Sequence, residues 1–181
     1  MKKKYVLWTA AVFAAAFSLS AATAMGKKPP SDESTLSSAG ATSIAVEVLF
    51  RQQQCNLQQA QTRWIDSADA YRTLFQELNK SYLGGDAQQP PAVDFSQHGV
   101  ILVAMGQKNT GGYVVDVANQ PALLEGDVLK VSVQWREPKK GMMVTQVLTS
   151  PCMLLKIPVA PFGRIEIKDQ NGTLRLSASR E

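Results

Sequence analysis

The sequence contains one histidine, His98, and two cysteines, Cys55 and Cys152. A tetrahedral metal site needs several such ligands, usually in closely spaced pairs, so these three residues predict no metal site. His98 follows Asp94 and Ser96 in one short stretch, which holds the residue types of a serine triad. Triad members converge from separate elements of a fold, so this stretch favours a surface turn leading into a strand. We therefore expect no catalytic residues, no metal and no cofactor, and we expect that the protein is not an enzyme.

The sequence also has no apolar run of the roughly 20 residues that a membrane-spanning helix needs. The apolar stretch at residues 5–19 follows Lys2, Lys3 and Lys4 and precedes Ala22-Thr23-Ala24. A basic start, a short apolar middle and an Ala-x-Ala end are typical of a secretory signal peptide; a membrane anchor is the competing interpretation. We expect cleavage after Ala24, which makes residues 1–24 a signal peptide and leaves no membrane span. The protein is then periplasmic or secreted, with a leader of bacterial type.

A large excess of one charge is absent once this leader is set aside. Three of the 19 Lys and Arg residues lie in the leader, and the other 16 nearly balance 15 Asp and Glu residues. A net charge of about +1 gives no electrostatic reason to expect nucleic acid as a partner.

The rest of the chain divides into two parts by composition. Residues 25–43 are mostly small and polar and cannot bury enough apolar area to offset the entropy of ordering, which predicts a flexible linker. Residues 44–181 have the usual size of one domain and show no internal repeat. We therefore expect a single domain from residue 44 to the end.

Apolar residues in this domain mostly recur at every second position, as in residues 129–135, which indicates half-buried strands. The unbroken apolar run at 100–105 predicts a central strand covered on both faces. Asn171-Gly172 predicts a tight hairpin turn at 169–172 that uses positive φ angles. The predicted strands are 44–50, 100–105, 113–117, 128–135, 143–148, 153–157, 165–167 and 174–177.

One segment, residues 67–82, has helical spacing instead. Its apolar residues recur at three- and four-residue steps, Asp66 or Ser67 can cap its start, and Gly84-Gly85 can end it. The stripe comprises Tyr71, Leu74, Phe75, Leu78 and Tyr82. The predicted class is α+β and β-rich: a small, mainly antiparallel sheet or sandwich with one amphipathic helix packed on it.

The two cysteines predict a disulfide, because exported chains live where disulfides persist; two buried free thiols are the alternative.

A glycine-rich loop, residues 106–112, connects the apolar run to the next predicted strand. Gly106 and Gly111 have the spacing of a phosphate-binding loop, but Gly112 and Tyr113 stand where that loop needs Lys and then Ser or Thr. A phosphate loop must also open a helix, whereas Tyr113 opens a predicted strand. The sequence therefore excludes nucleotide binding at this loop.

Two longer stretches, "GVILVAMGQKNTGGYVVDV" and "LKVSVQWREPKKGMMVTQVLTSPCMLLKIP", resemble the carboxy-terminal domain of the protease complex subunit PrcB family. The similarity covers about residues 95–158. It rests on the order and spacing of Thr-Gly-Gly-Tyr, a basic residue near Pro, Thr-Gln-x-Leu-Thr-x-Pro and a terminal Lys-Ile-Pro. The resemblance implies an exported, non-catalytic accessory or binding domain with a protein partner, for which a protease is one candidate.

Strand directions suggest where such a partner would bind. If 100–105 runs up and 113–117 runs down, a strand at 128–135 runs up again and brings its trailing loop beside the glycine-rich loop. We predict a basic recognition edge there; two ordinary solvated turns are the alternative. The candidate binding residues are Lys108, Asn109, Thr110, Gly111, Gly112, Tyr113, Arg136, Pro138 and Lys139.

A fainter similarity gives an alternative function. Residues 109–113 and 136–138 resemble loops of chagasin-like inhibitors of cysteine peptidases, which have an immunoglobulin-like sandwich. Three classes of function therefore stay open: an accessory or binding module, a peptidase inhibitor, and an enzyme of unrecognised type.

Overall fold

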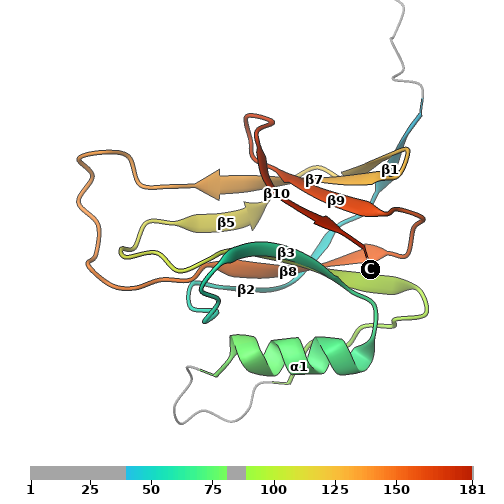
Figure 1. The fold of residues 1–181 in the computed structure, drawn as a ribbon, viewed down its shortest axis with the longest axis horizontal. Coiled ribbons are helices and arrows are strands. Elements are labelled where there is room, and N and C mark those ends of the chain that lie inside the picture. Colours follow the sequence, from blue (N-terminus) through green and yellow to red (C-terminus); the bar gives the residue numbers. More distant parts are fainter. Residues whose placement is uncertain (1–39, 81–88, 181) are drawn as a thin grey trace, which may run out of the picture. The chain divides into compact units, whose positions relative to one another are not determined.

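The computed structural model describes residues 40–80 and 89–180 of the chain. The expected signal peptide, most of the expected linker, Tyr82 and the Gly84-Gly85 helix end lie outside these residues. Two β-sheets pack face to face, and one helix covers the outer face of one sheet (Figure 1). This is the predicted α+β, β-rich class. Within the described ranges, no helix has the length and apolarity that crossing a membrane requires.

The first sheet has four strands in the order β2-β8-β4-β3. All its pairings are antiparallel. Its strands are β2 (Glu47–Gln52), β3 (Ala60–Ile65), β4 (His98–Met105) and β8 (Cys152–Pro158).

The second sheet has six strands. Five of them follow the order β1-β6-β7-β9-β10, and β5 pairs with β7 beside that path. Its strands are β1 (Ala41–Ile44), β5 (Val114–Val117), β6 (Ala122–Glu125), β7 (Val128–Arg136), β9 (Arg164–Lys168) and β10 (Leu174–Ser179).

Strand β4 is buried on both faces, as its unbroken apolar run predicted. Ile101, Val103 and Met105 enter the core between the two sheets. Val100, Leu102 and Ala104, which alternate with them, enter a second core under the helix. Because side chains in a strand point alternately to opposite faces, one apolar strand joins the two cores.

The helix α1 (Ala68–Leu78) covers the outer face of the four-stranded sheet. The Ser67 side chain accepts a hydrogen bond from Ala70 N and caps its first turn. Four residues of the predicted stripe, Tyr71, Leu74, Phe75 and Leu78, are buried against the sheet. The helix ends earlier than its pattern predicted, with Asn79 as its C-cap.

Several sequence predictions about strands were wrong. Predicted strand 44–50 is two strands in different sheets, and the first begins at Ala41, inside the segment expected to be a linker. Strands β3 and β6 were not predicted, and the segment 143–148 forms no strand. Strands β7 and β9 pair in parallel, an exception in a mainly antiparallel fold.

The β9–β10 hairpin forms where Asn171-Gly172 predicted it, but its turn differs in detail. Gly172 alone has a positive φ, +77°, whereas Asn171 has an ordinary negative one. The Gly172 N–H donates to the Asp169 carbonyl, and the Asp169 N–H donates to the Thr173 carbonyl. The loop is thus a five-residue one with a single left-handed glycine, not a two-residue turn with two positive φ angles.

A disulfide joins Cys55 to Cys152, as predicted. Both residues are fully buried in the core beneath the helix, and their Cα atoms lie 6.0 Å apart. The bond ties the segment after β2 to the first residue of β8.

Replacing both cysteines with alanine should lower the free energy of unfolding. The bond spans 97 residues, and on the chain-entropy model a loop of that size contributes about 4 to 5 kcal/mol before any strain is subtracted. Urea denaturation with and without dithiothreitol measures the effect. The reductant should destabilise the wild type and leave the Cys55→Ala/Cys152→Ala variant unchanged. Alkylation of both cysteines in the unreduced wild type would rule the bond out.

Candidate functional site

Pairing of β5 with β7 brings the two predicted loops to one end of the sandwich. Val114, the first residue of β5, lies opposite Arg136, the last residue of β7. The glycine-rich loop enters β5 at this point, and the segment 137–149 leaves β7 there (Figure 1). The adjacency inferred from strand directions is therefore present in the structure.

A third segment, residues 143–149, lies along the glycine-rich loop. Lys108 and Thr149 exchange two backbone hydrogen bonds of 2.7 and 2.9 Å. The Gly111 N–H donates to the Thr145 carbonyl at 2.9 Å, and the Thr149 hydroxyl donates to the Thr110 carbonyl at 2.9 Å. This contact was not predicted from the sequence.

The two adjacent glycines are needed for different reasons. Gly112 has a φ of +88°, and a Cβ there would lie 3.3 Å from Pro138 Cβ and 3.2 Å from Val144 Cγ1. Gly111 has no positive φ, but a Cβ there would lie 2.3 Å from Thr145 Oγ1. Gly112 thus answers both a backbone and a packing requirement, and Gly111 a packing requirement alone.

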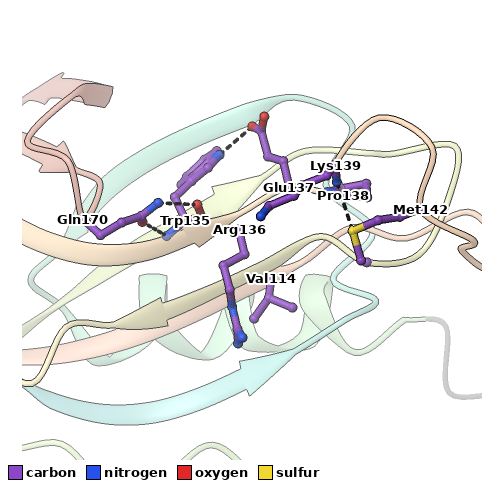
Figure 2. A pocket seen from close by; sticks show the side chains of 9 residues that line it. Val114, Trp135, Arg136, Glu137, Pro138, Lys139, Met142 and Gln170 are labelled. Carbon is purple, nitrogen blue, oxygen red and sulfur yellow. Dashed lines mark hydrogen bonds between the residues drawn. The ribbon is translucent and has the colours of Figure 1, made fainter.

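A pocket lies where the two loops meet (Figure 2). Within its lining, Lys139 N donates to Met142 Sδ at 3.3 Å. Four of its lining residues, Gly112, Arg136, Pro138 and Lys139, belong to the predicted recognition edge. The complete lining is Gly112, Val114, Trp135, Arg136, Glu137, Pro138, Lys139, Met142 and Gln170.

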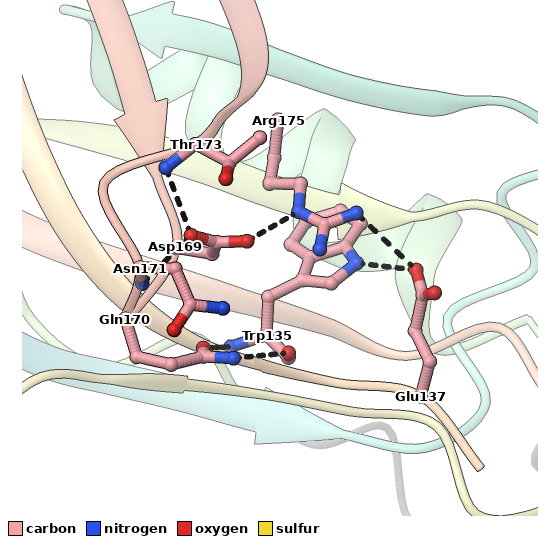
Figure 3. A network of polar contacts seen from close by, with 7 residues as sticks. All are labelled: Trp135, Glu137, Asp169, Gln170, Asn171, Thr173 and Arg175. Carbon is pink, nitrogen blue, oxygen red and sulfur yellow. Dashed lines mark hydrogen bonds and ion pairs between the residues drawn. The ribbon is translucent and has the colours of Figure 1, made fainter. Parts of the chain in front are cut away.

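A polar network that includes the pocket-lining residues Trp135, Glu137 and Gln170 clamps the end of β7 (Figure 3). Trp135 Nε1 donates to Glu137 Oε1 at 2.9 Å, and the Arg175 guanidinium lies 5.7 Å from the centre of the Trp135 ring. Arg175 also pairs with Glu137 at 3.6 Å and with Asp169 at 2.8 Å. The hairpin β9–β10 therefore holds the point at which the 137–149 segment begins.

The side-chain amide of Gln170 acts as a short substitute for a strand. It accepts a hydrogen bond from Trp135 N at 2.9 Å and donates one to the Trp135 carbonyl at 3.2 Å. Strand β9 pairs with β7 only as far as Ser132, so the backbone of Trp135 has no β9 neighbour. The Gln170 side chain therefore satisfies the two backbone groups of Trp135 that β9 does not reach.

Asp169 is the buried acid of this network. Burial alone would raise the pKa of its carboxyl group. Hydrogen bonds from the N–H groups of Thr173 and Asn171, and from Arg175, outweigh that effect and hold the pKa below its usual value. The carboxylate is thus stabilised in its charged form.

The Lys and Arg side chains of the described residues fall into two groups, those that form ion pairs and those that do not. Among the described residues, seven Lys and Arg side chains form ion pairs with acids, including Arg51 with Asp116 and Lys156 with Glu47. None of these ion pairs includes the four cations of the two loops. These four are Lys108, Arg136, Lys139 and Lys140.

The stretch around His98 forms a turn at the start of β4, at the end away from the loops. Both the N–H and the hydroxyl of Ser96 donate to Asp94 Oδ1, at 3.0 and 2.7 Å. These hydrogen bonds lower the pKa of the Asp94 carboxyl. The Ser96 hydroxyl is thus engaged by Asp94 in a local turn. Among residues 40–80 and 89–180, no cluster of His, Cys, Asp or Glu could hold a metal.

Comparison with protein families identifies the segment that contains these loops. Residues 100–158 match the PrcB C-terminal family. This confirms the resemblance predicted from the sequence. No curated protein and no solved structure matches the chain. The matched segment runs from β4 to β8 and contains both loops and the 143–149 segment.

The clamp that supports the loops lies partly outside the matched segment. Asp169, Gln170 and Arg175 belong to the β9–β10 hairpin, after the matched residues. The sequence predicted that hairpin from Asn171-Gly172 but not its contact with Trp135, because the contact depends on the parallel pairing of β7 and β9.

Replacing Gly112 with alanine should disturb the loop contact. Gly141 provides a matched control, because its φ is +86° and a Cβ there would meet nothing within 4 Å. Gly141→Ala should cost about 1 kcal/mol, the strain of a left-handed residue. Gly112→Ala should cost about 2 to 3 kcal/mol, because it adds crowding against Pro138 and Val144. Urea denaturation measures both, and equal costs would contradict the close approach of the loops.

Asp169→Asn should lower the thermal midpoint at neutral pH. It should also make the thermal midpoint fall less steeply as the pH is lowered. An acid with a lowered folded pKa contributes stability above its unfolded pKa of about 3.9, and this contribution is lost as the pH falls through the folded value. The wild type should therefore lose more stability than the variant between about pH 7 and about pH 3. Asp66→Asn, at an exposed position, is the matched control. Parallel pH profiles of wild type and Asp169→Asn would exclude this role.

Proposed function

We propose that the protein is an exported, non-catalytic accessory subunit of a protease complex, and that it binds its protein partner through the end formed by the two loops. The observation that carries this proposal is the match to the PrcB C-terminal family, whose name denotes a protease complex subunit. The matched residues include both loops, so the family resemblance and the candidate edge coincide in one segment.

Electrostatics supports the same end as the binding surface. Lys108, Arg136, Lys139 and Lys140 lie on two loops that meet there, and none of them joins an ion pair among the described residues. A rim of one charge steers an oppositely charged partner and disfavours wrong ones. We therefore place an acidic region of the partner against this end.

The expected location is the periplasm or the outside of the cell. The support is the basic start, short apolar middle and Ala-x-Ala end at residues 1–24. A disulfide between the only two cysteines agrees with an oxidising compartment.

A chagasin-like peptidase inhibitor is the second candidate. The observation in its favour is that residues 109–113 and 136–138 lie together at one end of a sandwich, since Gly112 contacts Pro138. The two candidates differ in the fate of the captured peptidase: it stays active in a complex with an accessory subunit and is blocked by an inhibitor.

Affinity capture from the envelope of the source organism tests the proposed function. The full chain, tagged at its C terminus, should retain a peptidase that mass spectrometry identifies and an activity assay detects. A Lys108→Ala/Arg136→Ala/Lys139→Ala variant should retain about tenfold less at low salt, because it removes the steering charge.

The matched control removes the same charge elsewhere. Lys80 and Arg164 form no ion pair among the described residues, and Arg63 forms only a 4.0 Å one, so Arg63→Ala/Lys80→Ala/Arg164→Ala should leave capture unchanged. Equal capture by the loop variant, with folding verified by circular dichroism, would remove the loops from the proposal. Recovery of no peptidase at all would overturn the proposed function, and recovery of an inactivated cysteine peptidase would favour the inhibitor.

A further inference from the structure

The segment 143–148 has the sequence of a strand and no strand partner. It reads Met-Val-Thr-Gln-Val-Leu, which is rich in β-branched residues and contains no glycine, proline or charge. Such a sequence favours a strand. In the structure it forms no ladder and runs as a coil between β7 and β8 (Figure 1). Within the part of the chain that the structure describes, the segment therefore pairs with no strand, although its sequence favours one.

This segment is nevertheless held in place on one side. Thr145 accepts from Gly111, and Thr149, just beyond its end, pairs with Lys108. In contrast, the backbone N–H groups of residues 143–148 donate to no acceptor among the described residues. A row of exposed backbone donors beside a fixed loop is a template for an added strand.

The segment also carries apolar side chains in water. Eight large apolar residues are exposed among those described, and four of them lie within residues 142–148. Met143 is fully exposed at 100%, and Met142, Val147 and Leu148 are 57%, 48% and 54% exposed. Single exposed apolar residues scattered over a surface are ordinary. Four of the eight exposed apolar residues within one short segment indicate a contact surface.

The charges around the segment decide which partner it fits. The segment itself is uncharged, but Lys139, Lys140, Lys108 and Arg136 flank it without acidic partners among the described residues. A second copy pairing through the same edge would bring these four cations against four others. An acidic segment would instead neutralise them.

We propose that residues 143–148 receive an extended, acidic and apolar segment of the partner protein by strand addition. The partner's backbone carbonyls accept from the free N–H groups, its apolar side chains cover Met143 and Val147, and its carboxylates meet Lys108, Lys139 and Lys140. This rests on the proposed function in one respect, namely that the partner is a protein. It adds the edge used and the chemistry of the segment that binds.

Selection of peptides on the immobilised full chain tests this directly. A displayed library of random ten-residue peptides should yield sequences that combine Asp or Glu with apolar residues at alternating positions. A synthetic peptide of the selected sequence should bind more weakly as salt rises. Selection of basic peptides, or of peptides with no charge bias, would overturn the proposal.

Two sets of variants then locate the peptide and its mode of binding. Met143→Ser/Val147→Ser should weaken peptide binding by about tenfold or more, because it removes central apolar contacts. Val159→Ser/Leu174→Ser removes two other exposed apolar side chains, at 49% and 50% exposure, and should have no effect. N-methylation of alternate peptide residues should abolish binding in one register and spare it in the other, as only strand pairing requires.

Failure of this inference can be told apart from failure of the proposed function. If the chain captures a peptidase equally well with and without Met143→Ser/Val147→Ser, the proposed function stands and the strand addition is wrong. If sedimentation shows a dimer that this variant dissociates, the segment serves a second copy and the proposal is again wrong. If the selected peptide binds equally well to Met143→Ser/Val147→Ser and to Val159→Ser/Leu174→Ser, the peptide binds elsewhere and the proposal is overturned.

Discussion

Strand β4 has no polar face from Gly99 to Met105, so both of its faces must be covered, and the arrangement of the other elements follows from this requirement. Strand β8, which lies beside β4, is also buried on both faces. Its Met153, Leu155 and Ile157 side chains enter one core, and Leu154 enters the other. The second sheet covers one side and α1 the other. Because β4 is fixed in this way, its exit at Gly106 is fixed too, and the glycine-rich loop starts from a rigid frame.

Local sequence patterns predicted the elements whose own apolar residues form a buried face. The helix was visible from its four-residue spacing, and β4 from its apolar run, because burial alone decides both. Strand β3 was missed because its sequence, Ala-Gln-Thr-Arg-Trp-Ile, is largely polar and belongs to an edge strand paired on one side only. Predicted strand 44–50 split in two because the chain changes sheets after Ile44, a tertiary event that leaves no local pattern.

The candidate site was predictable to the extent that strand direction controls it. Alternating up and down strands predict that the glycine-rich loop and the loop after β7 lie at one end, and the β5–β7 register bears this out. The contact between Gly111 and Thr145 was beyond such reasoning, because the 143–148 segment was predicted to be a strand of the sheet. The Gln170 amide was equally beyond it, since it reaches Trp135 only through the parallel β7–β9 pair.

Two backbone edges lie at the loop end of the molecule, and they differ in hydrogen bonding: one is blocked by a side chain, and the other, at residues 143–148, is open. An exposed edge invites unwanted pairing, so proteins commonly block it. Where β9 stops short of Trp135, the Gln170 side chain takes both backbone hydrogen bonds, and Arg175 covers the indole ring. A few residues later the chain leaves consecutive N–H groups without acceptors among the described residues and puts Met143 wholly into water. A fold that blocks one edge with a dedicated side chain, and leaves the neighbouring segment open, apolar and flanked by cations, supports the strand addition that we propose at residues 143–148.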